Sequence, residues 1–366
     1  MTGLAAFARH APLALTLAAA LTGGAVFQAI KAPIPWTLGP LTAVMLLRPV
    51  APWPLVWPGY LRGMAFAVLG SIIGSSFTPE VAARIMGQLA AMLAMTVAMT
   101  AFCLVLGALA ARGGGFDWPS GVMGTVPGGL SQMAPLCEEI GIGDVTIVTF
   151  LQTTRVLSVV FLVPFLTFHG LTGAGPAAGA GVGTPAVLRE APDLSLRTLL
   201  FIIAVIAGVP AARRLRLPNA WMLGPLLLTA GLTYNGLIPL RLPPPLITAA
   251  QLCIGTYLGL SLRPEKLQNW RAILPYTMLS GVALVGFSFL LAYAMSLSGN
   301  FDLTTAFLSA APGGMAEMAI TAVAVGADLS TVAAYQLFRL LFILLVFIPL
   351  LRWWLRQRGA SQRAAG

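Results

Sequence analysis

The sequence predicts an all-α polytopic membrane protein made of two inverted repeats, each with about five spanning helices and one broken or re-entrant helix. Three observations lead to this prediction. Of the 366 residues, 58% are hydrophobic and only 9% are charged, whereas soluble domains carry roughly a quarter charged residues. A single shift aligns most of the chain with itself. A proline–glycine interruption falls at the same place in both halves.

The longest apolar stretches have the length and composition of membrane helices. Residues 11–30, 85–111 and 272–301 each reach or exceed the roughly 20 residues needed to cross the hydrocarbon core. They are rich in Leu, Ala and Met and lack the alternation of a transmembrane barrel strand. We expect the first stretch to be a retained helix and not a signal peptide, because the second half has a matching stretch at 198–212.

Charge and cysteine content exclude several functional classes. The formal net charge is +10, but the basic residues stand singly between apolar stretches or cluster at 213–216 and 352–363. Loop charges that set membrane topology are distributed in this way, so we expect no nucleic-acid partner. Three cysteines without CxxC spacing and only two histidines predict neither a disulfide framework nor a metal site. No cofactor is expected.

A shift of 185 positions aligns the two halves. It places Trp36–Pro40 on Trp221–Pro225 and Gly70 on Gly255. Chance does not keep one register over so many uncommon residues, so we interpret the chain as a duplication. After a slip of one residue, the aligned pairs also include Asp144 with Asp328, Gln152 with Gln336, and Arg155 with Arg339.

Each repeat contains six predicted segments. The first membrane repeat covers 1–168, a Gly/Ala/Pro-rich connector covers 169–196, and the second repeat with a basic C-terminal tail covers 197–366. In the first repeat the segments are 11–30, 36–49, 60–77, 85–111, a broken element at 118–140, and 145–168. In the second they are 197–212, 219–235, 245–261, 272–298, a broken element at 303–325, and 329–351.

Loop charges predict opposite insertion of the two repeats. In the first half, most basic residues, such as Arg48 and Arg112, fall in the loops of one side. In the second half, the basic clusters at 213–216 and 263–271 occupy loops equivalent to the sparse side. By the positive-inside rule the repeats are inverted, and both termini are expected in the cytoplasm of a bacterial inner (plasma) membrane.

The two interruptions are the centre of the functional prediction. Val126–Met133 and Ala311–Met318 both contain Pro-Gly-Gly inside an otherwise apolar element. Proline removes a backbone donor, so a continuous helix stops there. A half-helix that begins after the break presents free N–H groups and partial positive charge, which attract anions. Alternatively, the glycines only permit close helix crossing. The predicted substrate- or ion-binding residues here are Pro127, Gly128, Gly129, Ser131, Gln132, Pro312, Gly313 and Gly314.

Glu317 is the most distinctive single residue. It follows the second break by one helical turn, and its counterpart Gln132 cannot titrate. Carboxylates within the membrane are rare, costly and commonly functional. Glu317 is therefore a candidate proton carrier or cation ligand. The alternative is an acid at a helix N-terminus that is neutralised by the helix dipole.

Two arginines are expected deep in the membrane. Arg155 and Arg339 each follow an aspartate by eleven residues, and Gln152 and Gln336 share their helix face at a spacing of three. We include all four among the predicted binding residues. The arginines would hold an anionic substrate or pair with an acid such as Glu317; a purely structural ion pair is the alternative. The aspartates themselves are expected to be N-caps.

These motifs resemble the duplicated AbrB membrane-protein family. Trp-x-Leu-Gly-Pro and Pro-Gly-Gly-x-x-x-Met occur in both halves. Members carry names of an ammonia monooxygenase or a regulator of gene expression, although no metal-ligand cluster or DNA-binding helix pair is visible here. The run Val126–Asp144 is also similar to the broken-helix region of bile-acid/sodium symporters and cation-antiporter-like transporters. That likeness implies crossed discontinuous helices and a panel–core, elevator-like arrangement.

The sequence thus favours secondary transport of a small anionic organic solute coupled to H⁺ or Na⁺. The alternative is a membrane-embedded regulator or scaffold that transports nothing. An enzyme is not expected, because no nucleophile–base set is visible. The expected partners are a small-molecule or ion substrate and the lipid bilayer, and a homodimer is compatible with the sequence.

Overall fold

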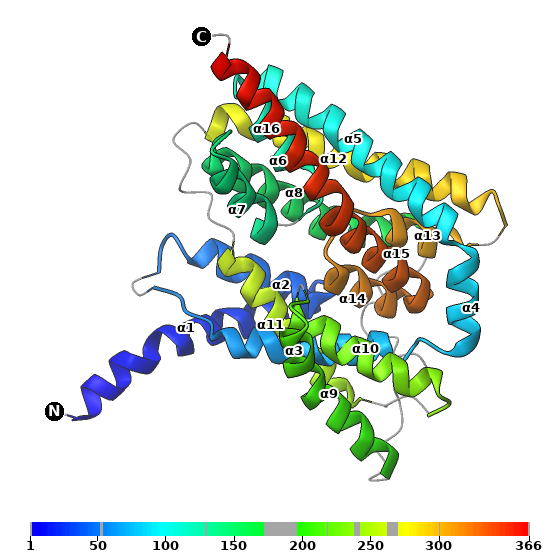
Figure 1. Cartoon of the computed structure of the whole chain (residues 1–366). Coiled ribbons are helices and arrows are strands. Elements are labelled where there is room, and N and C mark those ends of the chain that lie inside the picture. Colours follow the sequence, from blue (N-terminus) through cyan, green and yellow to red (C-terminus); the bar gives the residue numbers. More distant parts are fainter. Residues whose placement is uncertain are drawn as a thin grey trace. The chain divides into compact units, whose positions relative to one another are not determined.

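The chain is an all-α membrane protein. The computed structural model describes residues 2–51, 54–128, 130–171, 196–217, 219–237, 242–261, 270–299 and 301–364. Every regular element within these ranges is helical, as predicted (Figure 1). Five helices among them are long and apolar enough to cross a membrane: Ala11–Ala29, Leu89–Gly114, Val145–Leu171, Ile273–Ser296 and Leu329–Leu355.

The helices follow the two predicted repeats in order. The first repeat holds α1 (Thr2–Ala29), α2 (Pro35–Leu47), α3 (Gly59–Gly74), α4 (Pro79–Gly87), α5 (Leu89–Gly114), α6 (Trp118–Thr125), α7 (Leu130–Ile140), α8 (Val145–Leu166) and the π-helical turn η1 (Thr167–Leu171). The second holds α9 (Leu196–Arg214), α10 (Ala220–Tyr234), α11 (Pro244–Ser261), α12 (Trp270–Ser296), α13 (Leu303–Ala310), α14 (Met315–Val325), α15 (Leu329–Phe342), the π-helical turn η4 (Ile343–Phe347) and α16 (Ile348–Ala364).

Three boundaries differ from the sequence prediction. The segment expected at 85–111 is divided, since α4 ends at Gly87 and α5 begins at Leu89. The basic tail continues α16 as helix to Ala364. The connector predicted at 169–196 falls mostly on 172–195, outside the described residues, and its first three residues belong to η1.

Two compact units cut across the repeats. The first unit comprises Met1–Met86, Pro164–Leu262 and Ala319–Thr331, and the second comprises Gly87–Val163, Arg263–Met318 and Val332–Gly366. Each unit therefore combines elements of both repeats. Neither repeat is a compact body alone, because its helices bury their surfaces against helices of the other copy.

In the first unit, helices of each repeat pack against helices of the other repeat. Helix α3 of the first repeat packs on α10 of the second, and α11 of the second packs on α2 of the first (Figure 1). A Cβ atom added to Gly70 would lie 2.3 Å from the carbonyl oxygen of Met222. At the equivalent crossing, a Cβ on Gly255 would lie 2.2 Å from the carbonyl oxygen of Thr37. Both crossings thus depend on glycine to let the backbones touch.

The duplicated Trp-x-Leu-Gly-Pro motif supports a second pair of crossings. The glycine of each copy, Gly39 and Gly224, faces a glycine of the preceding helix. Added Cβ atoms would lie 2.3 Å and 2.1 Å from the carbonyl oxygens of Gly23 and Gly208, respectively. The motif therefore has a packing role in both copies.

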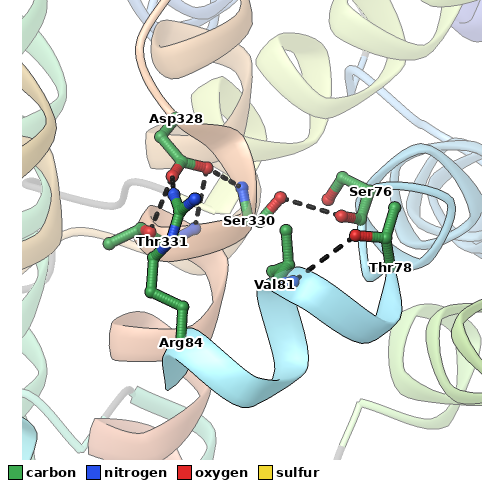
Figure 2. A network of polar contacts seen from close by, with 7 residues as sticks. All are labelled: Ser76, Thr78, Val81, Arg84, Asp328, Ser330 and Thr331. Atoms are coloured by element: carbon green, nitrogen blue, oxygen red, sulfur yellow. Dashed lines mark hydrogen bonds and ion pairs between the residues drawn. The ribbon is translucent and has the colours of Figure 1, made fainter. Parts of the chain in front are cut away.

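A polar corner joins α3 and α4 to the start of α15. The axes of α3 and α4 differ by 86°. At this bend Ser330 Oγ donates to the Ser76 carbonyl at 2.9 Å, and Arg84 Nη1 lies 3.6 Å from Asp328 Oδ2 (Figure 2). Asp328 Oδ1 also accepts from the backbone N–H groups of Ser330 and Thr331, at 3.0 and 3.2 Å. Asp328 is therefore an N-cap that also anchors the corner.

This corner allows a graded stability prediction. Arg84→Ala is expected to cost under about 1 kcal/mol, because the side chains of the ion pair are 60% and 35% exposed. Asp328→Ala removes the helix cap as well and should cost about 1 kcal/mol more. Melting temperatures of the purified variants in detergent check this order. A larger loss from Arg84→Ala than from Asp328→Ala would contradict it.

Candidate functional site

Both predicted interruptions are present. In the first repeat α6 ends at Thr125 and α7 begins at Leu130; in the second, α13 ends at Ala310 and α14 begins at Met315. The half-helices before the breaks start alike: Asp117 accepts from the Ser120 N–H at 2.9 Å, and Asp302 from the Thr305 N–H at 3.0 Å. Each Pro-Gly-Gly copy therefore separates two short helices, and the two copies keep the register of the duplication.

In the first repeat, α8 caps the carbonyl end of α6. Gln152 Nε2 donates to the carbonyl oxygens of Met123 at 2.7 Å and Val126 at 2.9 Å. Arg155 Nη1 donates to those of Thr125 at 3.1 Å and Val126 at 2.6 Å. These carbonyls lost their helical partners at the break, and in a membrane other protein groups must supply the missing hydrogen bonds.

The second repeat uses the same device on α13. Gln336 Nε2 donates to Leu308 O at 2.8 Å and Ala311 O at 3.0 Å. Arg339 donates from Nη1 to Ala311 O at 2.7 Å and from Nη2 to Gly313 O at 2.8 Å. Arg339 Nη2 also donates to the side-chain oxygen of Gln336.

The Gln-x-x-Arg motif thus places one amide and one guanidinium group at each break. Arg155 and Arg339 are both 7% exposed. A helix C-terminus carries partial negative charge, which offsets part of the cost of burying a cation. Both arginines donate to backbone carbonyls, a role that was not predicted from the sequence, and Arg339 also donates to the Gln336 side chain.

The methionine of each Pro-Gly-Gly-x-x-x-Met motif covers the first glycine of the same copy. A Cβ on Gly128 would lie 2.0 Å from Met133 Cε, and one on Gly313 would lie 2.5 Å from Met318 Cε. Both methionines are fully buried. The spacing of five residues therefore brings the methionine side chain back onto the first glycine of each break.

The second glycine of the second copy makes room for Glu317. The Glu317 side chain folds back over the break, and a Cβ on Gly314 would lie 1.9 Å from its Oε2. The residue is 7% exposed and occupies the first turn of α14. Positive partial charge at this helix start favours a carboxylate there. The position suits both a helix-capping acid and an ion-binding acid.

In the second unit, the break of the second repeat is in contact with the first repeat. A Cβ on Gly313 would approach Val159 Cγ1 of α8 to 3.2 Å, so a helix of the first repeat touches the break of the second. Helices α5 and α12 run side by side (Figure 1), and the equivalent residues Phe102 and Phe287 stack with ring centroids 4.1 Å apart. The second unit, like the first, therefore contains direct contacts between the two repeats.

Cys103 on α5 is a site residue that the sequence reasoning missed. It is fully buried. Its carbonyl accepts from Thr125 Oγ1 at 2.8 Å. One signal was available, because the duplication aligns Cys103 with Ser288, another small polar residue in an apolar helix.

The remaining predicted residues are placed only in part. Pro127 and Pro312 lie in the breaks. Gly129, and the side chains of Ser131 and Gln132, lie outside the described residues. Asp144 is an N-cap as expected, since its Oδ1 accepts from the Thr146 N–H at 2.7 Å. Within the described ranges, no group of three or more His, Cys, Asp or Glu side chains gathers where it could hold a metal ion.

Comparison with known proteins shows a family likeness over most of the chain. The family described as "Transition state regulatory protein AbrB" matches residues 36–355. The chain is 29% identical over 322 residues to "Putative regulator AbrB" of Escherichia coli strain K12, covering 87% of this chain and 89% of that protein. It is 27% identical over 356 residues to "Uncharacterized protein YhjN" of Bacillus subtilis strain 168, covering 92% and 91%.

Proposed function

We propose that this chain, which belongs to the AbrB family of membrane proteins, is a secondary transporter of a small anionic organic solute coupled to H⁺ or Na⁺. One observation carries the proposal: both breaks, one from each repeat, lie in the second compact unit, and a buried Gln–Arg pair at equivalent positions holds each of them. Discontinuous helices in corresponding positions of two repeats are typical of transporter binding sites.

In each broken helix, protein side chains bind the carbonyl end of the first half, and the second half begins with an N-terminal end. Gln152, Arg155, Gln336 and Arg339 occupy the carbonyl ends of α6 and α13. The N-terminal end of α7 then remains to attract an anionic group, whereas the Glu317 carboxylate lies at the start of α14. In this proposal Glu317 carries the proton or binds the sodium ion. The two buried guanidinium groups balance the charge of the solute.

The division of the chain into two compact units suits a panel–core transporter, in which one unit would move the solute past the other. We place the protein in the bacterial plasma membrane with both termini in the cytoplasm, because its loop charges follow the positive-inside rule in opposite senses in the two halves.

Solute-driven ion flux into proteoliposomes tests the proposal. Carboxylates and amino acids are added outside vesicles that contain a pH-sensitive or sodium-sensitive dye, and wild type is compared with Gly128→Leu. We expect the variant to lose flux while it stays folded, since the three atoms nearest to an added Cβ all belong to the flexible side chain of Met133. A variant with full flux, or a wild type silent to every solute, would contradict the proposal.

A membrane-embedded regulator or scaffold is the second candidate. The name of the Escherichia coli relative, "Putative regulator AbrB", favours it. A scaffold would show no solute-driven flux in vesicles, and Gly128→Leu would change only its stability. The same proteoliposome experiment therefore separates the two functions.

A further inference from the structure

The Gln–Arg caps of the two repeats are not equivalent. In the second repeat the cap is closed, because Arg339 Nη2 donates to the Gln336 side-chain oxygen. In the first repeat, Gln152 Oε1 and Arg155 Nε are buried and have no hydrogen-bond partner in the described part of the chain. Gln152 is 1% exposed and Arg155 is 7% exposed. Unsatisfied buried polar atoms are costly, so a native structure that keeps them usually has a use for them.

The two atoms without a described partner, which make the first cap open, belong to neighbouring polar groups. Gln152 Nε2 and Arg155 Nη1 both donate to the same oxygen, that of Val126, at 2.9 and 2.6 Å. The amide orientation of Gln152 is set by the network, because its nitrogen serves two carbonyl oxygens. The open group on Gln152 is therefore an acceptor, and the open group on Arg155 is a donor that carries positive charge.

We propose that this open cap holds the solute, and that the solute is a carboxylate with a hydrogen-bond donor on the adjacent carbon, such as a 2-hydroxy or 2-amino acid. Arg155 Nε donates to a carboxylate oxygen, and Gln152 Oε1 accepts from the hydroxyl or ammonium group. In the second repeat the cap is closed, so the solute does not bind there, and Glu317 of that repeat binds the coupling ion. The inference rests on the proposed transport function and adds the chemical class of the solute and the repeat that binds it.

Ligand-dependent melting of the purified full-length protein tests this inference. Glycolate and glycine each pair a carboxylate with an adjacent donor, whereas acetate has the carboxylate alone. We expect glycolate or glycine to raise the melting temperature, with acetate binding about tenfold more weakly, because acetate leaves Gln152 Oε1 unsatisfied. Equal shifts with all three acids would exclude recognition by Gln152 and overturn the inference.

Arg155→Lys and Arg339→Lys form a matched pair for the same measurement. Each keeps a positive charge, but Arg155→Lys removes the open Nε–H group. We expect it to abolish the shift by glycolate or glycine. Arg339→Lys should lower the melting temperature without ligand and keep the ligand-induced shift. The reverse pattern would assign the solute to the second repeat and contradict the inference.

A buried water molecule is the competing occupant, since water also offers a donor and an acceptor. In that case none of the three acids would shift the melting temperature of the wild type, and the inference would fail. The transport proposal is judged separately by proteoliposome flux. If other solutes drive flux while glycolate and glycine leave the melting temperature unchanged, transport stands and the open cap does not bind the solute.

Discussion

Replacing Glu317 by glutamine is expected to abolish ion-coupled flux while the protein stays folded. Glu317 lies at the start of α14 and is 7% exposed as a residue, and the charged form of a buried carboxyl group is costly. If Glu317 takes up and releases the coupling ion, an amide of nearly the same shape should block the cycle completely. Solute-driven acidification or sodium entry in proteoliposomes measures the loss.

Two comparisons separate this effect from a loss of structure. The duplication places Gln132 at the position equivalent to Glu317, so glutamine is already tolerated in this sequence context. Glu139→Gln removes an exposed acid that pairs with Arg352 at 2.9 Å, and it should leave flux intact. Persistent coupling in Glu317→Gln would refute the ion-carrying role and leave Glu317 as a helix-capping acid.

Replacing Gly255 by leucine is expected to prevent stable folding of the first unit. A Cβ here would lie 2.2 Å from the Thr37 carbonyl oxygen, and backbone cannot move aside as a side-chain end can. Overpacking of this kind typically costs 1–3 kcal/mol for small additions, so a leucine against backbone should cost about 3 kcal/mol or more. Yield of monodisperse protein after detergent extraction and its melting temperature measure the effect.

The equivalent crossing supplies a second test of the same idea. Gly70→Leu should be as damaging as Gly255→Leu, because its Cβ would meet the Met222 carbonyl oxygen at 2.3 Å. Gly231→Leu in α10 adds the same volume where nothing lies within 4 Å, and it should be tolerated. A folded Gly255→Leu variant would show that α2 and α11 do not touch at Gly255.

The elements that local chemistry controls were predictable. Both breaks could be placed from the three-residue Pro-Gly-Gly motif at Pro127 and Pro312. A proline alone would not have sufficed, since Pro40 and Pro225 lie inside helices. The N-cap role of Asp144 also follows from local hydrogen bonding. The separation of α4 from α5 was missed, since the apolar pattern runs through Gly87 and Leu89 without a proline.

The candidate site was predicted in its residues more than in its contacts. Gln152, Arg155, Gln336 and Arg339 were selected because they recur in register. Their hydrogen bonds to the carbonyl ends of α6 and α13 could not be foreseen, as donor and acceptor lie 25 to 30 residues apart along the chain. Cys103 was missed for the same reason: only packing brings its carbonyl against Thr125 beside the first break.

From the amino-acid order alone follow the membrane class, the duplication and the two interrupted helices, because each depends on composition, register or the chemistry of neighbouring residues. Folding in three dimensions settles which helices pair, since glycines such as Gly70 and Gly255 meet backbones more than a hundred residues away. It also makes the two caps unequal. The two Gln-x-x-Arg motifs have the same spacing, but among the described residues the glutamine side-chain oxygen accepts a hydrogen bond only in the second repeat. This difference depends on side-chain conformations in the packed protein, which the sequence spacing does not specify.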